Sequence, residues 1–208
     1  MSIKVKCYPH GMLEENTYLI TDEASGLQAV IDPGYYGNDV ATDIAISDNL
    51  KYIILTHAHY DHYSAAAEYI SHYSKAEFVV PSAEKYLLSK DEDPAFLSIG
   101  INAKGCPNGN IEVGEGDVLE LGENKLSFIE TPGHTEGGMC VRIGNILFSG
   151  DTLFRASVGN TTFETGNWNE LKQSIKNKLF VLDDDTVVYP GHGPATTIGY
   201  EKEFNPFV

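Results

Sequence analysis

The stretch "LTHAHYDHYSA", residues 55–65, places three histidines and one aspartate within six positions, directly after the apolar run "YIIL". A run of this kind predicts a buried strand, and an extended chain projects alternate side chains to the same side. His57 and His59 are therefore expected to share one cation. A helical stripe that begins near Ala65 places Asp61 and His62 at a helix N-terminus, pointing in a neighbouring direction. We therefore expect a second cation a few ångströms away.

The same setting recurs three times further along the chain, as a metal-capable residue in a glycine-rich turn after an apolar strand. His134 follows "LSFIE", Asp151 follows "ILF" and His192 follows "TVVY". Loops at strand ends are where sites on a rigid sheet collect. Five of the seven histidines lie in these motifs. We give structural roles to the other two, His10 in a "YPHG" turn and His72 late on a predicted helix.

Each of these residues taken alone also has a structural interpretation. Asp61 suits a helix N-cap, Asp151 suits a turn after Gly150, and a lone histidine is usually a hydrogen-bonded structural residue. Seven separate structural roles in equivalent positions explain the pattern less well than one shared site. The predicted metal ligands are His57, His59, Asp61, His62, His134, Asp151 and His192.

Imidazole and carboxylate ligands without thiolate suit zinc best, and iron or manganese also fit. A natural partition gives the first metal His57, His59 and His134, and the second Asp61, His62 and His192, with Asp151 spanning both. Two divalent cations about 3.5–4 Å apart would lower the pKa of a shared water from 15.7 towards ~7. We therefore expect a bridging hydroxide as nucleophile, with Asp61 and Asp151 as the catalytic carboxylates.

Short β-branched runs alternate with segments of helical period along the chain. This alternation predicts an α+β protein with sheets sandwiched between helices. Residues 91–116 are predicted to be a loop that either borders a site or connects two halves. Predicted strands cover 17–20, 29–31, 52–55, 78–80, 118–121, 126–129, 139–143, 146–148 and 186–189. Predicted helices cover 39–48, 65–73, 82–90 with Ser82 as N-cap, and 171–179.

Composition narrows the class of protein. A chain of 208 residues suits one domain, 1–208, and 30 acidic against 14 basic residues give a net charge of −16, which disfavours nucleic acid and anionic membranes as partners. The sequence shows neither a signal-peptide core nor a membrane-length apolar run, so we expect a soluble cytoplasmic protein. Three cysteines without a CxxC pair fit a reducing compartment, and Cys7, Cys106 and Cys140 are expected to be buried.

The motifs "THAHYDH", "PGHT", "SGDTLF" and "PGHGPAT", in this order, resemble those of the metallo-β-lactamase superfamily. "GDTLF" and the tail "TIGYEKEFNPF" are similar to its short, single-domain glyoxalase II-like hydrolases. The resemblance implies a four-layer αβ/βα sandwich with a dinuclear site at one edge, between two central sheets. It also implies that a metal-bridging hydroxide attacks a carbonyl carbon and that a thiolate or alkoxide leaves. Aspartate at 151, where the commonest zinc β-lactamases carry cysteine, argues against lactam hydrolysis.

The chain departs from the glyoxalase II-like pattern in two places. Asn160 and Thr162 stand where an arginine and an aspartate are usual, so a charged pair near the loop after Asp151 is expected to be missing. Only 16 residues follow His192, so we expect no C-terminal helical substrate domain and carry over no glutathione-binding residue. Candidate pocket residues, for which structural roles are favoured, are Tyr60, Lys104, Arg155 and Tyr200.

The leading hypothesis is a dinuclear metallohydrolase that cleaves a thioester of the hydroxyacylglutathione type, or a related ester. One alternative is a mononuclear iron persulfide dioxygenase that uses His57, His134 and Asp151. A lactone hydrolase and a non-catalytic metal-binding protein are further alternatives. Metal content and oxygen consumption separate the first two.

Overall fold

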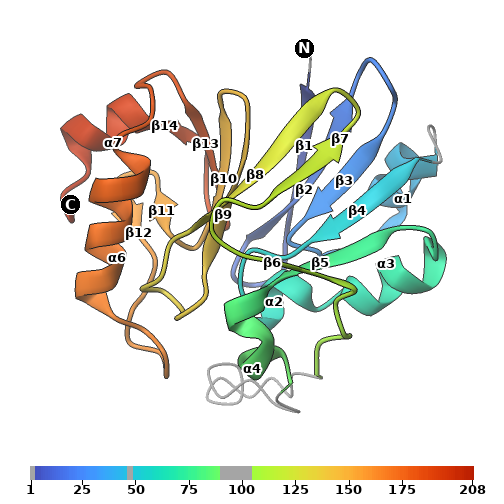
Figure 1. Cartoon of the computed structure of the whole chain (residues 1–208), viewed down its shortest axis with the longest axis horizontal. Coiled ribbons are helices and arrows are strands. Elements are labelled where there is room, and N and C mark those ends of the chain that lie inside the picture. The colour runs from blue at the N-terminus through green and yellow to red at the C-terminus, as the bar shows by residue number, and fades with distance from the viewer. Residues whose placement is uncertain (1–2, 46–48, 90–104) are drawn as a thin grey trace.

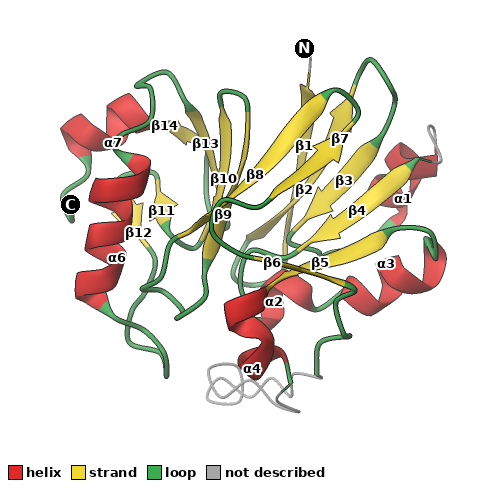
Figure 2. Cartoon of the chain, in the orientation of Figure 1, coloured by secondary structure: helices red, strands yellow, loops and turns green. Residues whose placement is uncertain are grey.

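The computed structural model describes residues 3–45, 49–89 and 105–208. Two six-stranded sheets pack face to face, and helices cover their outer faces (Figure 1, Figure 2). This arrangement is the expected αβ/βα sandwich of the α+β class. No helix in the described part of the chain is long and apolar enough to cross a membrane.

The first sheet has the order β1-β2-β3-β4-β5-β6. Its first three strands pair antiparallel, and β3 to β6 pair parallel. The strands are β1 (Ile3–His10), β2 (Glu15–Asp22), β3 (Gln28–Ile31), β4 (Leu50–Ile54), β5 (Glu77–Pro81) and β6 (Ile111–Val113). Its helices are α1 (Asn38–Ala45), α2 (Tyr60–Tyr63), α3 (Ala66–His72), the 3₁₀ turn η1 (Ser82–Glu84) and α4 (Lys85–Leu88).

The second sheet has the order β14-β13-β10-β9-β8-β7, antiparallel except for the β10–β13 pair. A small hairpin, β11 (Leu153–Phe154) and β12 (Ser157–Val158), follows β10. The strands are β7 (Val118–Leu121), β8 (Asn124–Glu130), β9 (Met139–Ile143), β10 (Ile146–Gly150), β13 (Val187–Pro190) and β14 (Thr196–Thr197). The helices are α6 (Trp168–Ser174), continued by the π turn η2 (Ile175–Leu179), and α7 (Ile198–Phe204).

Alternation of side chains along the strands builds the layers. Ile53 of β4 packs outward among helix residues such as Tyr69, whereas Ile54 points inward, where it meets Phe128 of the second sheet. Burial of a side chain of this size contributes about 1.5–3 kcal/mol. Because both faces of each sheet are covered, the strands are rigid supports for the loops at their ends.

The nine predicted strands match nine observed strands to within two residues at each end. Strands β1, β6, β11, β12 and β14 were not predicted, and β6 lies inside the expected loop 91–116. Ser82 is not an N-cap, because it lies within the 3₁₀ turn that Pro81 precedes. Cys7 is exposed rather than buried, because it lies on the edge strand β1. The ends of the predicted helices at 46–48 and 90, together with 91–104, lie outside the described residues.

Candidate metal centre

Four loops, each leaving the C-terminal end of a strand, deliver the predicted ligands to one edge of the sandwich. These loops follow β4, β8, β10 and β13. Backbone hydrogen bonds join them in pairs: the Met139 N–H donates to the Thr56 carbonyl at 3.0 Å, and the Gly191 N–H donates to the Gly150 carbonyl at 2.8 Å. The seven predicted ligands therefore meet at one place because these strands from both sheets end at the same edge of the sandwich.

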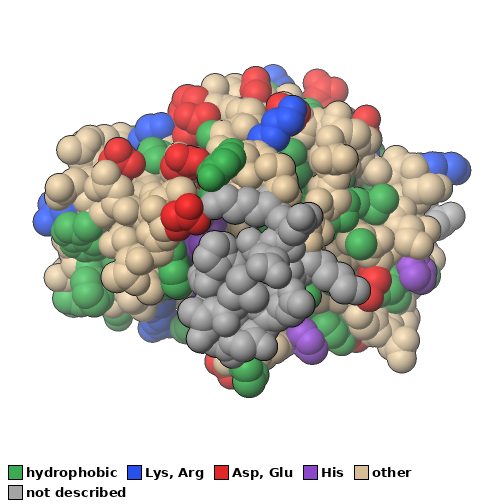
Figure 3. Space-filling model, turned by 90° about the horizontal axis from the view of Figure 1, so that it is seen from below, with side chains coloured by type: hydrophobic (Ala, Val, Ile, Leu, Met, Phe, Trp, Pro, Cys, Tyr) green, Lys and Arg blue, Asp and Glu red, His purple; other side chains and the backbone are tan. Residues whose placement is uncertain are grey.

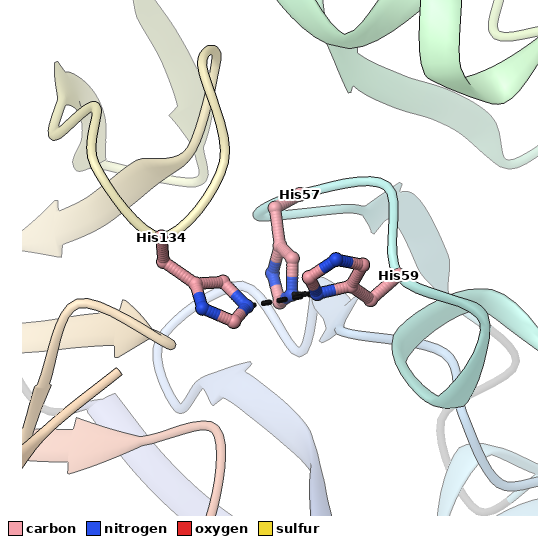
Figure 4. A group of neighbouring side chains, drawn as sticks. All are labelled: His57, His59 and His134. Carbon is pink, nitrogen blue, oxygen red and sulfur yellow. Dashed lines mark hydrogen bonds between the residues drawn. The ribbon is translucent and has the colours of Figure 1, made fainter. Parts of the chain in front are cut away.

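The first triad consists of His57, His59 and His134, whose ring nitrogens converge (Figure 4). His59 Nδ1 lies 3.1 Å from His57 Nε2 and 2.8 Å from His134 Nε2. His134 Nδ1–H donates to the Asn160 carbonyl at 2.6 Å, which leaves the lone pair of Nε2 pointing into the triad. Lone pairs that converge in this way repel one another unless a cation lies between them.

His57 takes its orientation from a chain of hydrogen bonds behind the triad. The Thr56 hydroxyl donates to Asp32 Oδ2 at 2.9 Å, so its oxygen is free to accept the Nδ1–H of His57 at 3.1 Å. The Thr56 N–H also donates to Asp32, at 2.8 Å. Such bonds fix the tautomer of a metal-binding histidine and leave Nε2 as the ligand atom.

The second triad consists of Asp61, His62 and His192. His192 Nε2 lies 3.3 Å from Asp61 Oδ2, and His62 Nε2 lies 3.9 Å from Asp61 Oδ1. His62 Nδ1–H donates to Asp32 at 3.0 Å, and His192 Nδ1–H donates to the Leu13 carbonyl at 2.8 Å. Both rings therefore present Nε2 to the same space.

Asp151 lies between the two triads. Its Oδ2 is 3.4 Å from His134 Nε2 and 3.5 Å from His192 Nε2, and its Oδ1 is 3.4 Å from His62 Nε2. Asp151 Oδ1 and His62 Nε2 are buried and have no hydrogen-bond partner. Buried polar atoms of this kind are costly unless an ion or water satisfies them. The two atoms therefore fit a divalent cation.

Burial keeps the first triad neutral. It lowers the pKa of His57 well below the usual value, and burial followed by the neighbouring His134 lowers the pKa of His59 to about 3. Burial also lowers the pKa of His134. Neutral imidazole is the form that binds a metal ion.

Opposite charges govern the second triad. Burial opposes protonation of His62, but Asp61, Asp151 and Asp32 together raise the pKa of that imidazole well above its usual value. Burial would raise the pKa of Asp151, but its histidine neighbours, His62 first, hold it well below the usual range. A cationic group is therefore favoured at this position in the fold.

Two residues that orient the predicted ligands, Asp32 and Glu84, were not predicted from the sequence. Asp32 orients His62 directly and His57 through Thr56, and Glu84 accepts hydrogen bonds from the loops that carry the first triad. Asp32 follows β3 in "VIDPG", the same strand-exit setting as the predicted ligands, so the pattern was sufficient to find it. Glu84 follows β5 within a segment that reads as an ordinary helix start.

The loop after Asp151 is held without a charged pair. The Asn160 side chain accepts hydrogen bonds from the N–H and hydroxyl of Thr162 at 3.0 and 2.9 Å, while its backbone carbonyl accepts from His134. A Cβ on Gly159 would lie 1.8 Å from the Asp151 carbonyl, so glycine is required there. Uncharged hydrogen bonds and close packing thus hold this part of the loop.

His72, Arg155 and Tyr200 contact residues that belong to neither triad. His72 Nδ1–H donates to the Glu68 carbonyl at 3.0 Å, as a structural histidine would. The Arg155 guanidinium lies over the Tyr200 ring, 5.2 Å from its centroid, so these two candidates contact each other. Lys104 lies outside the described residues.

A cavity of about 190 Å³ opens beside the second triad. Met12 and Leu13 of the β1–β2 turn, Tyr60 and Asp61 line it, together with His10, which stacks on Tyr35. His10 is therefore nearer to the site than its isolated turn suggested. The cavity is therefore lined by Asp61, a predicted metal ligand, and by the apolar side chains of Met12 and Leu13.

The chain is similar in sequence and in fold to known proteins. A family model described as the metallo-beta-lactamase superfamily matches residues 10–192. "Hydroxyacylglutathione hydrolase GloC" of Haemophilus influenzae is 33% identical over 217 residues, covering 99% of this chain and 98% of the relative. The solved structures of BLEG-1, described as a B3 metallo-beta-lactamase, and of TTHA1623 in a di-iron-bound form are 31% and 30% identical, with TM-scores of 0.88 and 0.85. Each alignment covers 98% of this chain, with 99% and 100% of the respective structures.

These likenesses span the fold and all four loops of the site. The metallo-β-lactamase fold binds divalent metals, and the histidine and aspartate cluster is placed to hold them. The chain belongs to the metallo-β-lactamase superfamily.

Proposed function

We propose that the protein is a dinuclear metal-dependent hydrolase of a thioester, of the hydroxyacylglutathione type, or of a related ester. The observation that carries the proposal is the meeting of two triads at Asp151, whose free oxygen faces a free ring nitrogen of His62. If the first triad held the single metal ion of the protein, the convergence of Asp61, His62 and His192 would have no explanation. The first triad is proposed to hold one ion and the second triad the other, with Asp151 as a ligand of both and zinc as the preferred metal.

Divalent ions, when bound, acidify coordinated water and polarise a carbonyl oxygen. Residues around the ligands orient the histidine rings and keep their N–H groups out of the site. Asp32, the Asn160 carbonyl and the Leu13 carbonyl each accept the Nδ1–H of a histidine, so that no Nδ1–H faces the site from His62, His134 or His192. The reaction space is thus lined by acceptors, which suits cations and a polarised electrophile.

The surroundings favour an acyl substrate. The cavity beside Asp61, with Met12, Leu13 and Tyr60 in its wall, would take the acyl portion, and the ring of Phe163 lies 5.1 Å from that of His59 on the other side. On the face that carries α2 and α4, the visible Lys and Arg side chains lie towards the margins, and a histidine shows beside a carboxylate nearer the centre (Figure 3). The name of the Haemophilus influenzae relative supports a thioester of glutathione.

The test is metal analysis of protein purified without added metal, combined with release of thiol from S-lactoylglutathione. We expect about two ions per chain and metal-dependent thiol release that Asp151→Ala abolishes. About one iron per chain with oxygen consumption on a persulfide would instead favour the dioxygenase. No turnover of thioesters, lactones or phosphodiesters above the rate of His59→Ala would favour a non-catalytic role.

Hydrolysis of a β-lactam is a second candidate, because the solved structure with a TM-score of 0.88 is described as a B3 metallo-beta-lactamase. Aspartate at 151 remains our argument against it. A chromogenic cephalosporin in the same substrate panel decides the question, since faster cleavage of the lactam than of the thioester would reverse the order of the two candidates.

A further inference from the structure

We propose that Glu84 is a positioning residue that sets the affinity of the first triad for its metal ion while leaving that of the second triad unchanged. Glu84 ends the 3₁₀ turn after β5 and is fully buried. Glu84 lies outside the two loops, after β4 and after β8, that carry the first triad. The inference rests on the proposed pair of metal sites and is independent of the reaction that they catalyse.

Both carboxylate oxygens of Glu84 are used, and each is bound to a different ligand loop. Oε2 accepts the N–H of Ala58 at 2.9 Å, and Oε1 accepts the N–H of Gly137 at 2.8 Å. Ala58 lies between His57 and His59, and Gly137 lies three residues after His134. One buried carboxylate therefore joins the two chain segments that supply all three histidines of the first triad.

The contact between the second of these loops and the 3₁₀ turn is close. A Cβ on Gly137 would lie 2.7 Å from the Ala83 Cβ and 2.9 Å from the Glu84 nitrogen. The loop therefore packs directly against the turn that carries Glu84. Because the Glu84 side chain is fully buried and bonded to both loops, its two hydrogen bonds fix the spacing of the loops.

The second triad is oriented by other groups. Asp32 accepts the Nδ1–H of His62, and the Leu13 carbonyl accepts that of His192. These supports lie just after β3 and on the β1–β2 turn, whereas Glu84 lies after β5. Loss of the Glu84 hydrogen bonds should therefore act on the first triad alone.

The decisive variant is Glu84→Gln, which is nearly isosteric but replaces one acceptor oxygen with an NH₂ donor that faces a backbone N–H. Zn²⁺ is titrated into the apo protein against a competing chelator, in place of an activity assay. We expect the dissociation constant of one of the two ions to rise about 10–100-fold, the usual effect of removing a group that orients ligands, and the other to stay unchanged. Glu112→Gln, the same change at a carboxylate that pairs with Lys85 on the surface, is the matched control and should alter neither constant.

Single-site backgrounds show which ion is affected. Glu84→Gln should weaken Zn²⁺ binding in a His192→Ala background, where the first triad is intact, and should have no further effect in a His59→Ala background. Equal weakening of both ions, no weakening, or an effect that persists with His59→Ala would overturn the proposal. If Glu84→Gln does not fold, Glu84→Asp, whose shorter side chain cannot reach both loops, takes its place, and an unchanged first-ion constant in that variant contradicts the proposal.

Discussion

At the scale of single residues, Asp151 differs from the other ligands because it faces both triads. Its Oδ2 is nearly equidistant from a histidine of each, at 3.4 and 3.5 Å. The other ligands face one triad, apart from His57 and His62, which approach each other and Asp151. Substitutions at Asp151 and at a ligand of one triad should therefore have different consequences for metal binding.

Asp151→Ala should impair both metal positions, whereas His192→Ala should retain about one ion per chain, held by the first triad. The physical reason is that Asp151 supplies an oxygen to each triad, while His192 Nε2 faces the second triad and Asp151. Metal per chain after dialysis, measured by mass spectrometry, checks this. Equal loss of metal in the two variants would show that the partition is wrong.

Gly191→Ala should weaken the second ion at least about tenfold, as expected when the groups that place ligands are displaced. The added Cβ would lie 2.2 Å from Asp151 Oδ1 and 2.7 Å from His62 Cε1, so both side chains would have to shift. Zn²⁺ titration of the apo protein measures the effect.

The control for this change is Gly144→Ala, whose Cβ would meet nothing within 4 Å but whose φ of +58° is strained for alanine. It should lower the free energy of unfolding by about 1–2 kcal/mol without altering either metal constant. If both variants lose metal alike, general destabilisation rather than the local clash is responsible.

The sequence predicted the cluster of seven side chains but not the residues that orient them. His57 and His134 are recognisable because a strand-exit motif depends only on nearby residues. Asp32 shares that setting and was overlooked, whereas Glu84 owes its contacts with Ala58 and Gly137 to tertiary packing. Nothing in the local sequence of a helix start tells which distant backbone groups it will meet.

At the scale of elements, strand β1 and helix α1 are joined through one carboxylate. Asp43 of α1 accepts hydrogen bonds from Lys6 and Tyr8 of β1. The bond from Lys6, followed by that from Tyr8, lowers the pKa of Asp43. This link fastens an edge strand to the helix layer and lies on a different sheet from Asp151.

Asp43→Asn should lower the free energy of unfolding of the apo protein at pH 7 by less than about 1 kcal/mol, because the pair is partly exposed. A carboxyl with a depressed folded pKa stabilises the fold above its unfolded pKa, about 3.9, and loses that contribution as pH falls through the folded value. Urea unfolding at several pH values should therefore show the two proteins converging in acid. A difference that grows as pH falls would contradict the assignment.

Which strands were predictable depends on how they are buried. Strands β4 and β9 have runs of buried residues, and such runs are visible as apolar segments. Strand β1, "IKVKCYPH", alternates lysine with apolar residues at an edge, and β6 has only three residues. Short or edge strands gain their pairing from a neighbour rather than from their own composition.

At the scale of the whole molecule, the net charge of −16 acts against an anionic substrate. Between about 0.01 M and 0.15 M salt the Debye length falls from about 30 Å to about 8 Å, so distant carboxylates are screened. We expect kcat/KM for S-lactoylglutathione to rise severalfold over this range, whereas that for an uncharged thioester should stay constant. A fall in kcat/KM for the anionic substrate would indicate local positive charge that dominates the overall field.

The hydrogen bond from His192 to the Leu13 carbonyl spans 179 positions of the chain. All three residues of the first triad have been synthesised by position 134, but the second triad also needs His192. During translation, the first triad, Asp61 and His62 can thus leave the ribosome before His192 has been added. The second triad can therefore form only after synthesis has passed β13.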